Sequence, residues 1–309
     1  MTSITLNNLK PSHLAILGDA AYRAGDMGMA KAFYQQLINA APRSPQAHSR
    51  MGLTLRPTRR CPAMLDVINT LELVTRAGVF VGEGIATWMK QPAFIDDERF
   101  LELASKDLEI APVGVTNWHW NLQTVLWAAQ QVRNLPGDFV ELGVFRGHTT
   151  MFLAEYLDFG AWDKRWWLFD TFEGIPDDQV DPGWETVNKG AYGGTFTFEE
   201  VRDRFAPFGN IDVTKGRVPE IFETVCPEQI AFMHIDLNNA TAEVGALDAL
   251  YDRISPGGII VFDDFGWQTA HAQFKAESEW FRSRGLAVFP VPTGQGVFVK
   301  PPQPDSPRA

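Results

Sequence analysis

The chain has 309 residues, of which 45% are hydrophobic and 21% charged, so it can bury a large apolar core and does not have the composition of a disordered protein. Its formal net charge of −11 argues against bulk electrostatic attraction to nucleic acid or to an anionic membrane. The two cysteines supply neither a disulfide framework nor a zinc-ligand set, and no run of about 18 apolar residues could span a bilayer, so we expect no membrane span and a cytoplasmic location.

Residues 1–60 differ in charge from the rest of the chain, since they contain eight Lys/Arg but only two acidic residues. Six positions match the spacing of one tetratricopeptide repeat, a helix–turn–helix of about 34 residues: Leu14, Leu17, Gly18, Ala30, Tyr34 and Pro42. We therefore predict a helical tetratricopeptide-like module over 1–60, ended by a Pro/Arg-rich linker at 57–62. It either docks on the main domain or a partner subunit, or offers a groove to a foreign protein.

Residues 61–115 are predicted to form a helical linker or lid region, with helices over 63–76 and 96–107, and a further helix is expected over 118–132. From 116 to 300, short apolar runs alternate with amphipathic helices, which predicts an α/β domain with a seven-stranded doubly wound sheet. The expected strands are 139–142, 166–169, 211–214, 231–235, 258–262, 287–291 and 297–300, and the expected helices are 149–157, 198–205, 244–253 and 269–284. The proline-rich tail, 301–309, is expected to be unstructured.

The first chemical motif runs from Glu141 to Thr149 and predicts a strand, a turn with glycines four residues apart, and a helix. Gly143 allows a sharp backbone turn beneath a ligand, and Gly147 opens a helix whose amides can meet a carboxylate. The spacing is not the Gly-x-Gly-x-x-Gly of dinucleotide-binding proteins. On its own the motif is as compatible with a purely structural turn as with a ligand loop.

Acidic residues follow three more of the expected strands. Asp170 can accept hydrogen bonds from two ribose hydroxyls, although a turn-forming role is the alternative. Asp236 ends one strand and Asp263-Asp264 end another, so the three converge if these strands are neighbours. Hard oxygen ligands grouped in this way suit Mg²⁺, whereas capping of the following helices is the alternative.

Four segments together resemble the macrocin O-methyltransferase family over about residues 115–300: Glu141–Thr149, Asp170–Pro176, His234–Asp236 and Pro256–Gly266. The resemblance implies a class I methyltransferase (Rossmann-like) fold and an enzyme that uses S-adenosylmethionine and a metal ion to methylate sugar hydroxyls in antibiotic or surface-polysaccharide pathways. The residues expected to bind the cofactor are Glu141, Gly143, Arg146, Gly147, His148, Thr149, Asp170, Thr171, Phe172, Gly216 and Asp236. The resemblance also implies that Asp236, Asp263 and Asp264 hold Mg²⁺.

The sequence departs from the family pattern at one position. The family often has His-Ile-Asp-x-Asp-Leu-Tyr, with the second Asp as the proposed general base, and here that position is Asn238. A neutral amide cannot take a proton at physiological pH, so another residue is the base, the metal alone acidifies the hydroxyl, or catalysis is lost. His271 is the predicted substitute, with an ordinary surface histidine as the alternative. His234, inside a strand, is expected to belong to the core.

We therefore expect an O-methyltransferase that acts on a sugar or glycan hydroxyl, free or nucleotide-linked. The Gly- and aromatic-rich segment 177–197 would cover the sugar, or else be a surface loop. Two alternatives stay open: a non-catalytic adaptor that binds S-adenosylmethionine or a glycan, and a methyltransferase for catechol-like phenols. We also expect a homo-oligomer and a possible protein partner for the basic repeats.

Overall fold

The computed structural model describes residues 9–42, 44–54, 80–82, 85–87, 90–106, 110, 118–185, 188 and 196–302. The chain divides into two units, residues 1–81 with 86–90 and residues 82–85 with 91–309. The predicted helix over 63–76, the linker at 57–62 and most of the tail lie outside the described residues.

The described residues of the first unit form three helices: α1 (Pro11–Ala24), α2 (Met27–Ala40) and α3 (Pro45–Thr54). A Cβ on Gly18 would lie 2.4 Å from the ring of Tyr34, so this glycine does allow α1 and α2 to approach closely. Arg50, one of the basic residues, is buried in an ion pair with Asp19 and is not part of a basic surface. The predicted helical hairpin is confirmed, whereas its assignment as a tetratricopeptide repeat stays a prediction.

Two short strands, β1 (Phe80–Gly82) and β2 (Ile85–Thr87), form a small sheet that no sequence pattern indicated. Three residues are too few for a strand to show a hydrophobic period. In the region of the helix expected over 96–107, the structure has a 3₁₀ turn (Ala93–Asp96) followed by α5 (Glu98–Ala104). The helix expected over 118–132 corresponds to α6 (His119–Gln131).

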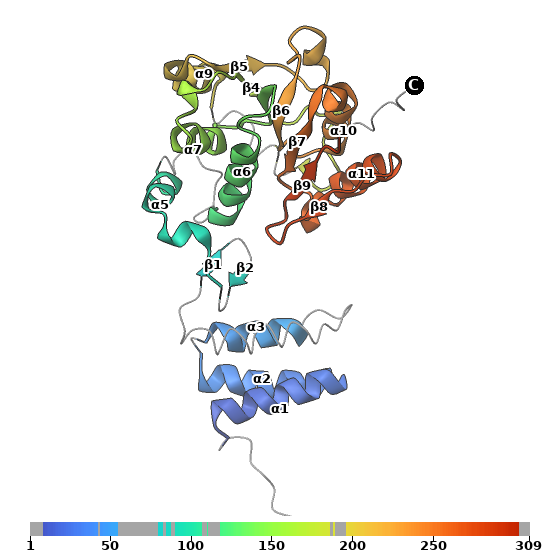
Figure 1. Ribbon diagram of the computed structural model, residues 1–309. Coiled ribbons are helices and arrows are strands. Elements are labelled where there is room, and N and C mark those ends of the chain that lie inside the picture. The colour runs from blue at the N-terminus through green and yellow to red at the C-terminus, as the bar shows by residue number, and fades with distance from the viewer. Residues whose placement is uncertain are drawn as a thin grey trace, which may run out of the picture. The chain divides into compact units, whose positions relative to one another are not determined.

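A seven-stranded sheet forms the centre of the second unit (Figure 1). Its strands, in the spatial order β5-β4-β3-β6-β7-β9-β8, are Ile211–Lys215, Trp166–Asp170, Asp138–Leu142, Ile230–Ile235, Ile254–Phe262, Gly296–Val299 and Phe289–Pro290. The first five are parallel, β9 runs antiparallel to β7, and β8, paired antiparallel to β9, runs in the same direction as the first five. The predicted seven-stranded sheet is confirmed, although β7 begins earlier and β8 is shorter than expected.

The helices around this sheet are α6, which contacts β6 and β7, together with α7 (His148–Tyr156), α9 (Phe198–Phe205), α10 (Ala240–Leu250) and α11 (His271–Arg282). Every residue of β6 is buried, as expected for a central parallel strand covered on both faces. From β3 the chain adds β4 and β5 on one side, and it later returns to add β6 and β7 on the other. The strand order therefore reverses between β3 and β6, where ligands bind in folds of this kind.

Candidate active site

The register of the parallel strands brings four of the predicted site residues to one level. Leu142 pairs with both Phe169 and Ile235, and Ile235 pairs with Phe262. The residue that follows each of these therefore lies at the same edge of the sheet, which we call the rim. These four residues are Gly143, Asp170, Asp236 and Asp263. The expected convergence of these strand ends is therefore present.

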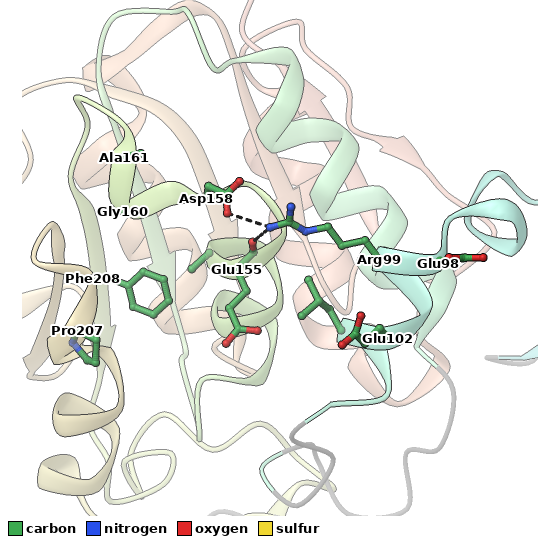
Figure 2. Close-up of a pocket in the computed structure, with 11 residues that line it drawn as sticks. Glu98, Arg99, Glu102, Glu155, Asp158, Gly160, Ala161, Pro207 and Phe208 are labelled. Carbon is green, nitrogen blue, oxygen red and sulfur yellow. Dashed lines mark hydrogen bonds and ion pairs between the residues drawn. The ribbon is translucent and has the colours of Figure 1, made fainter.

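An open groove elsewhere on this unit does not belong to the rim (Figure 2). It is lined by α5, the carboxyl end of α7 and the segment around Phe208. Arg99 there donates to Asp158, and Lys106 pairs with Glu155, both at the surface. Because α7 starts at the rim and runs away from it, this groove lies at the opposite edge of the sheet.

The two predicted ligand-loop glycines are required by the protein's own packing. Gly143 has φ +84°, and a Cβ there would lie 1.9 Å from the carbonyl oxygen of Asp236. Gly147 has φ +83°, precedes α7, and its Cβ would meet the ring of Phe205 at 2.6 Å. Gly143 therefore makes the sharp turn that was predicted, and the group packed most closely against it is the backbone that follows β6.

Asp170 joins the loop after β3 to the loop after β4. Its Oδ2 accepts the N–H groups of Val144 and Phe145, each at 2.8 Å, and its Oδ1 accepts that of Phe172 at 2.7 Å. A carboxylate has roughly four acceptor positions, so three are already used. Burial raises the pKa of Asp170 although these donors favour its ionised form. Contact with ribose hydroxyls, which needs the remaining position or a rearrangement, stays a prediction.

Left-handed backbone conformations gather in the loops of the rim. Phe145, Phe172 and Asn238 have φ of 49°, 54° and 58°, and they follow β3, β4 and β6 respectively. Such strain costs an ordinary residue about 1–3 kcal/mol and is found most often at ligand sites and switch regions. The rim carries the backbone signature of a binding site independently of its acidic residues.

The remaining cofactor candidates lie in the same loops. The guanidinium of Arg146 stands 5.2 Å from the centre of the Phe145 ring, and His148 and Thr149 begin α7, where His148 is buried. Thr171 donates through Oγ1 to the carbonyl of Gly174 at 2.6 Å. Gly216 follows β5, and a Cβ there would meet the side chain of Ile221 at 2.5 Å. Direct contact of these residues with a cofactor stays a prediction.

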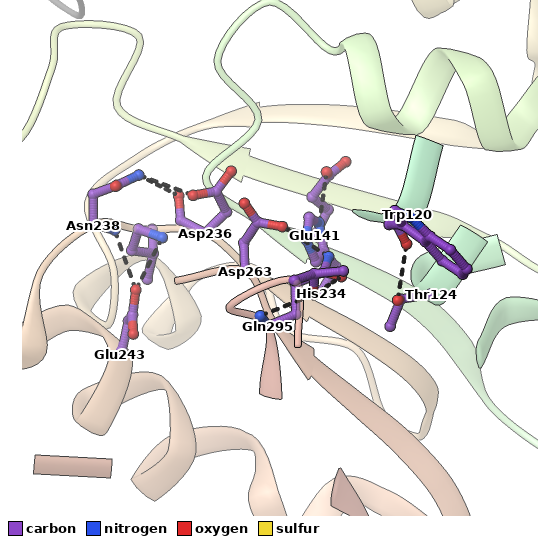
Figure 3. A network of polar contacts seen from close by, with 11 residues as sticks. Trp120, Thr124, Glu141, His234, Asp236, Asn238, Glu243, Asp263 and Gln295 are labelled. Carbon is purple, nitrogen blue, oxygen red and sulfur yellow. Dashed lines mark hydrogen bonds and ion pairs between the residues drawn. The ribbon is translucent and has the colours of Figure 1, made fainter. Parts of the chain in front are cut away.

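A buried chain of polar side chains crosses three strands beneath the rim (Figure 3). His234 Nδ1 lies 3.0 Å from Glu141 Oε1, and its Nε2 lies 3.6 Å from Asp263 Oδ1. Gln295 donates to the same Asp263 oxygen at 3.0 Å. Burial lowers the pKa of His234, but Asp263 and Glu141 outweigh burial and raise that pKa to about 10.

His234 is thus buried as predicted, but its ring lies between two carboxylates that raise its pKa, so it is not ordinary core. The cofactor candidate Glu141 is likewise 3% exposed and faces His234, beneath the strand end. Both residues therefore support the rim from below. The sequence pattern could not reveal this, because their partners come from different strands.

The charges of Asp263 and Asp264, which follow β7, act on the pKa of Asp236, and Asp263 acts on that of Asp264. Burial first, and then the charges of Asp263 and Asp264, raise the pKa of Asp236 well above its ordinary value. Among the described residues, the carboxylates of Asp236 and Asp263 accept hydrogen bonds through Oδ1, from Asn238 and Gln295 respectively, so Oδ2 of each can accept a further ligand. Mutual repulsion of this kind is relieved by a proton or by a cation.

Among the residues that the structure describes, no group of three or more His, Cys, Asp and Glu side chains is arranged to hold a metal ion. Mg²⁺ commonly uses only one or two protein carboxylates and completes its shell with water and substrate oxygens. The donor type and charge at the rim therefore suit Mg²⁺, and Asp236, Asp263 and Asp264 stay the predicted ligands.

Asn238 and His271, the two catalytic candidates, occupy different surroundings. Asn238 is 9% exposed and donates from Nδ2 to Asp236 Oδ1 at 2.9 Å, so the amide serves the rim as a hydrogen-bond donor. His271 is exposed at the start of α11, where its ring stacks on Phe274. No hydrogen bond among the described residues links His271 to the rim aspartates.

The segment after β4 is attached to two neighbouring rim loops. Asp181 accepts the N–H of Ala240 at the start of α10 at 2.9 Å. The indole of Trp184 donates to the carbonyl of Thr269, in the loop after β7, at 3.0 Å. This part of the predicted covering loop therefore reaches the β6 and β7 side of the rim, where the acidic residues lie.

A sheet of six strands in one direction and one antiparallel strand, β9, with a glycine turn after β3 and a carboxylate at the end of β4, defines the class I methyltransferase fold. Within that class, the chain belongs to the macrocin O-methyltransferase (TylF) family, whose pattern matches residues 114–285, more than half of the chain. The family resemblance drawn from the sequence is thereby confirmed.

Named relatives give a finer comparison. The 8-demethyl-8-(2,3-dimethoxy-alpha-L-rhamnosyl)-tetracenomycin-C 4'-O-methyltransferase of Streptomyces olivaceus is 29% identical over 160 residues, 48% of this chain and 59% of that protein. Mycinamicin III 3''-O-methyltransferase of Micromonospora griseorubida is 28% identical over 142 residues, 42% of this chain and 56% of that protein. The chain thus spans little more than half the length of these relatives.

Among solved structures, the O-methyltransferase NovP gives a TM-score of 0.49 at 21% identity and covers 59% of this chain and 79% of that chain. The fold assignment here rests on strand order and register. None of the described helices has both the length and the apolar character needed to cross a membrane.

Proposed function

We propose that the chain is an S-adenosylmethionine-dependent O-methyltransferase that acts on a sugar hydroxyl. The observation that carries the proposal is the rim itself, where the Gly143 turn, Asp170 and the acidic group around Asp236 meet beside the point of strand reversal. Membership of the family supports the reaction. A relative whose name specifies a rhamnosyl group supports the substrate class.

The two sides of the rim would have separate tasks. The loops after β3 and β4, with their left-handed Phe145 and Phe172, would hold the cofactor beside Asp170. Asp236, Asp263 and Asp264 would hold Mg²⁺ on the other side, where a cation would lower the pKa of an acceptor hydroxyl. Positioning of the two reactants would then supply much of the rate enhancement.

The acceptor sugar would lie on the β6 and β7 side. Trp184 is fixed there by its bond to Thr269, and Trp267, 43% exposed, follows the Asp263-Asp264 pair closely in the chain. An indole ring offers an apolar face and the nearby aspartates offer hydrogen-bond acceptors, the combination that a sugar ring needs. This placement favours a sugar over a purely apolar acceptor.

Asn238 leaves two routes for the hydroxyl proton. In one route His271 accepts it; in the other it passes to water once the hydroxyl has been acidified. The neutral amide of Asn238 cannot take up this proton, and its Nδ2 donates to Asp236. The His271→Ala variant separates the routes, because only the first predicts a large loss of kcat.

The decisive experiment is methyl transfer from labelled S-adenosylmethionine to a panel of free, nucleotide-linked and glycosidic 6-deoxysugars, with a catechol as comparison. Transfer to a sugar hydroxyl, lost in Asp236→Ala, supports the proposal. Turnover of the catechol alone would transfer it to the phenol class. Tight cofactor binding with no turnover of either would favour the non-catalytic adaptor.

Three broader expectations belong to the same proposal: a cytoplasmic enzyme, a homo-oligomer, and a protein partner for the basic helical unit. Light scattering of the full chain tests the second. Co-purification of a defined partner that is lost when residues 1–60 are removed tests the third.

A further inference from the structure

A buried polar cluster behind the rim has no role in the site described so far. It consists of Glu243 on α10 and Gln273 and Glu277 on α11, which are 2%, 1% and 1% exposed. Buried carboxylates and amides destabilise a helix interface unless they are well paired, and apolar side chains would pack there at less cost. Their presence therefore calls for an explanation other than packing.

Glu243 reaches back from the first turn of α10 to the loop that precedes it. Its Oε1 accepts three hydrogen bonds, from the N–H of Leu237 at 3.2 Å, from the N–H of Asn238 at 3.1 Å and from Nε2 of Gln273 at 3.0 Å. Figure 3 shows the Glu243 carboxyl group directed at the Asn238 turn. One carboxyl oxygen thus ties the loop after β6 to two helices.

The turn held in this way is left-handed and points at the rim. Asn238 has φ 58°, a conformation that asparagine adopts more readily than most residues with a side chain. In this conformation the amide donates to Asp236 Oδ1. The backbone N–H groups that face Glu243 and the side-chain amide that faces Asp236 therefore belong to one fixed unit.

Resting on the proposed function, we propose that Glu243, held by Gln273, is a positioning residue for methyl transfer. It fixes the Leu237–Asn238 turn so that the Asn238 amide orients the Asp236 carboxylate. A neutral donor at this position suits an acidic rim, because a second carboxylate there would repel Asp236. Asn238, the residue that departs from the family pattern, thus has a function that depends on the bonds of Glu243 to Leu237, Asn238 and Gln273. We call these bonds the clamp.

Glu277, on α11, is buried beside Glu243. Burial raises the pKa of Glu277 to about 7, and burial together with the charge of Glu277 raises that of Glu243. Both shifts follow from burial and from the repulsion between two neighbouring carboxyl groups.

The test is a double-mutant cycle on kcat with Glu243→Ala and Asn238→Gly. Each single change is expected to lower kcat about tenfold, the effect of one lost orienting hydrogen bond. The double variant should be no slower than either single variant, since Glu243 acts through Asn238. The Kd for S-adenosylmethionine should stay within about twofold, because its loops follow β3 and β4.

Glu243→Gln keeps an acceptor oxygen and should recover most of kcat; it replaces Glu243→Ala in the cycle if the alanine variant does not fold. Asp248→Ala is the matched control, because it removes another α10–α11 bond, the one that Trp280 donates to Asp248 at 2.7 Å, without touching the loop. It should leave kcat unchanged. Additive losses in the cycle, or equal losses in Glu243→Ala and Asp248→Ala, would overturn the proposal.

A second measurement separates this proposal from the proposed function. If the wild-type chain methylates no sugar, the proposed function fails, but the clamp can still be tested by amide hydrogen exchange. The N–H groups of Leu237 and Asn238 should exchange at least about tenfold faster in Glu243→Ala than in the wild type. Equal exchange rates would overturn the clamp itself.

Discussion

Replacing Gly143 by alanine tests the geometry on which the whole rim depends. The added Cβ would lie 1.9 Å from the carbonyl oxygen of Asp236, a backbone atom that cannot rotate away, and the residue has φ +84°. The left-handed conformation alone costs about 1–2 kcal/mol for alanine. Forcing β3 and β6 apart adds about 1–3 kcal/mol by analogy with overpacked cores. We therefore expect a loss of about 2–5 kcal/mol, a large share of the ~5–15 kcal/mol that stabilises a typical domain.

Gly285→Ala is the matched control, because Gly285 has φ +69° and no atom lies within 4 Å of the position that its Cβ would take. It should lose only the conformational part, about 1–2 kcal/mol. Urea unfolding followed by tryptophan fluorescence reports on the sheet unit, since nine of the ten tryptophans lie at or beyond residue 118. Equal losses of stability in the two variants would refute the clash, and unchanged affinity of Gly143→Ala for S-adenosylmethionine would refute the site.

Individual contacts give three further predictions. Asp170→Asn replaces an acceptor of three N–H groups with an amide, so stability should fall by about 2 kcal/mol or more and S-adenosylmethionine should bind at least about tenfold more weakly in calorimetry; unchanged affinity would contradict the ribose assignment. Chelation should abolish methyl transfer and Mg²⁺ should restore it, while Asp263→Ala should lower kcat about a hundredfold or more; full activity in chelator would exclude the metal mechanism. Glu277 faces Glu243 and Asp264, and burial raises its pKa to about 7. The native state therefore holds the proton of Glu277 more tightly than the unfolded state does. The resulting stabilisation is complete below about pH 4.5 and is lost as pH rises through 7. Relative to Glu277→Gln, the wild type should therefore lose up to about 3 kcal/mol between about pH 5 and 8 in urea titrations, and a flat difference would contradict the burial of this carboxyl group.

Most of the secondary structure of the second unit could be predicted from the sequence. The helix over Phe198–Phe205 has the expected bounds, because a Thr197–Glu200 capping box and an amphipathic pattern are local signals. The strand ends that carry Asp170, Asp236 and Asp263 were also identifiable, since a polar residue after a buried apolar run marks the end of a strand. The rim residues could therefore be named before their arrangement was known.

The use that each rim residue makes of its neighbours was decided only by the tertiary structure. Asp170 uses three acceptor positions to bind two loops, and the pKa of His234 is raised because β3 and the end of β7 place a carboxylate on either side of it. Glu243 holds the Asn238 turn from a helix that looked like ordinary packing in the sequence. Asp170 and Glu243 also bind backbone groups close to them in the chain, but the Asp170 bonds to the loop after β3, the contacts of His234 and the Gln273–Glu243 bond join residues far apart in the sequence. Local patterns record burial and backbone hydrogen bonding, whereas these contacts depend on strand order, register and the packing of α10 against α11.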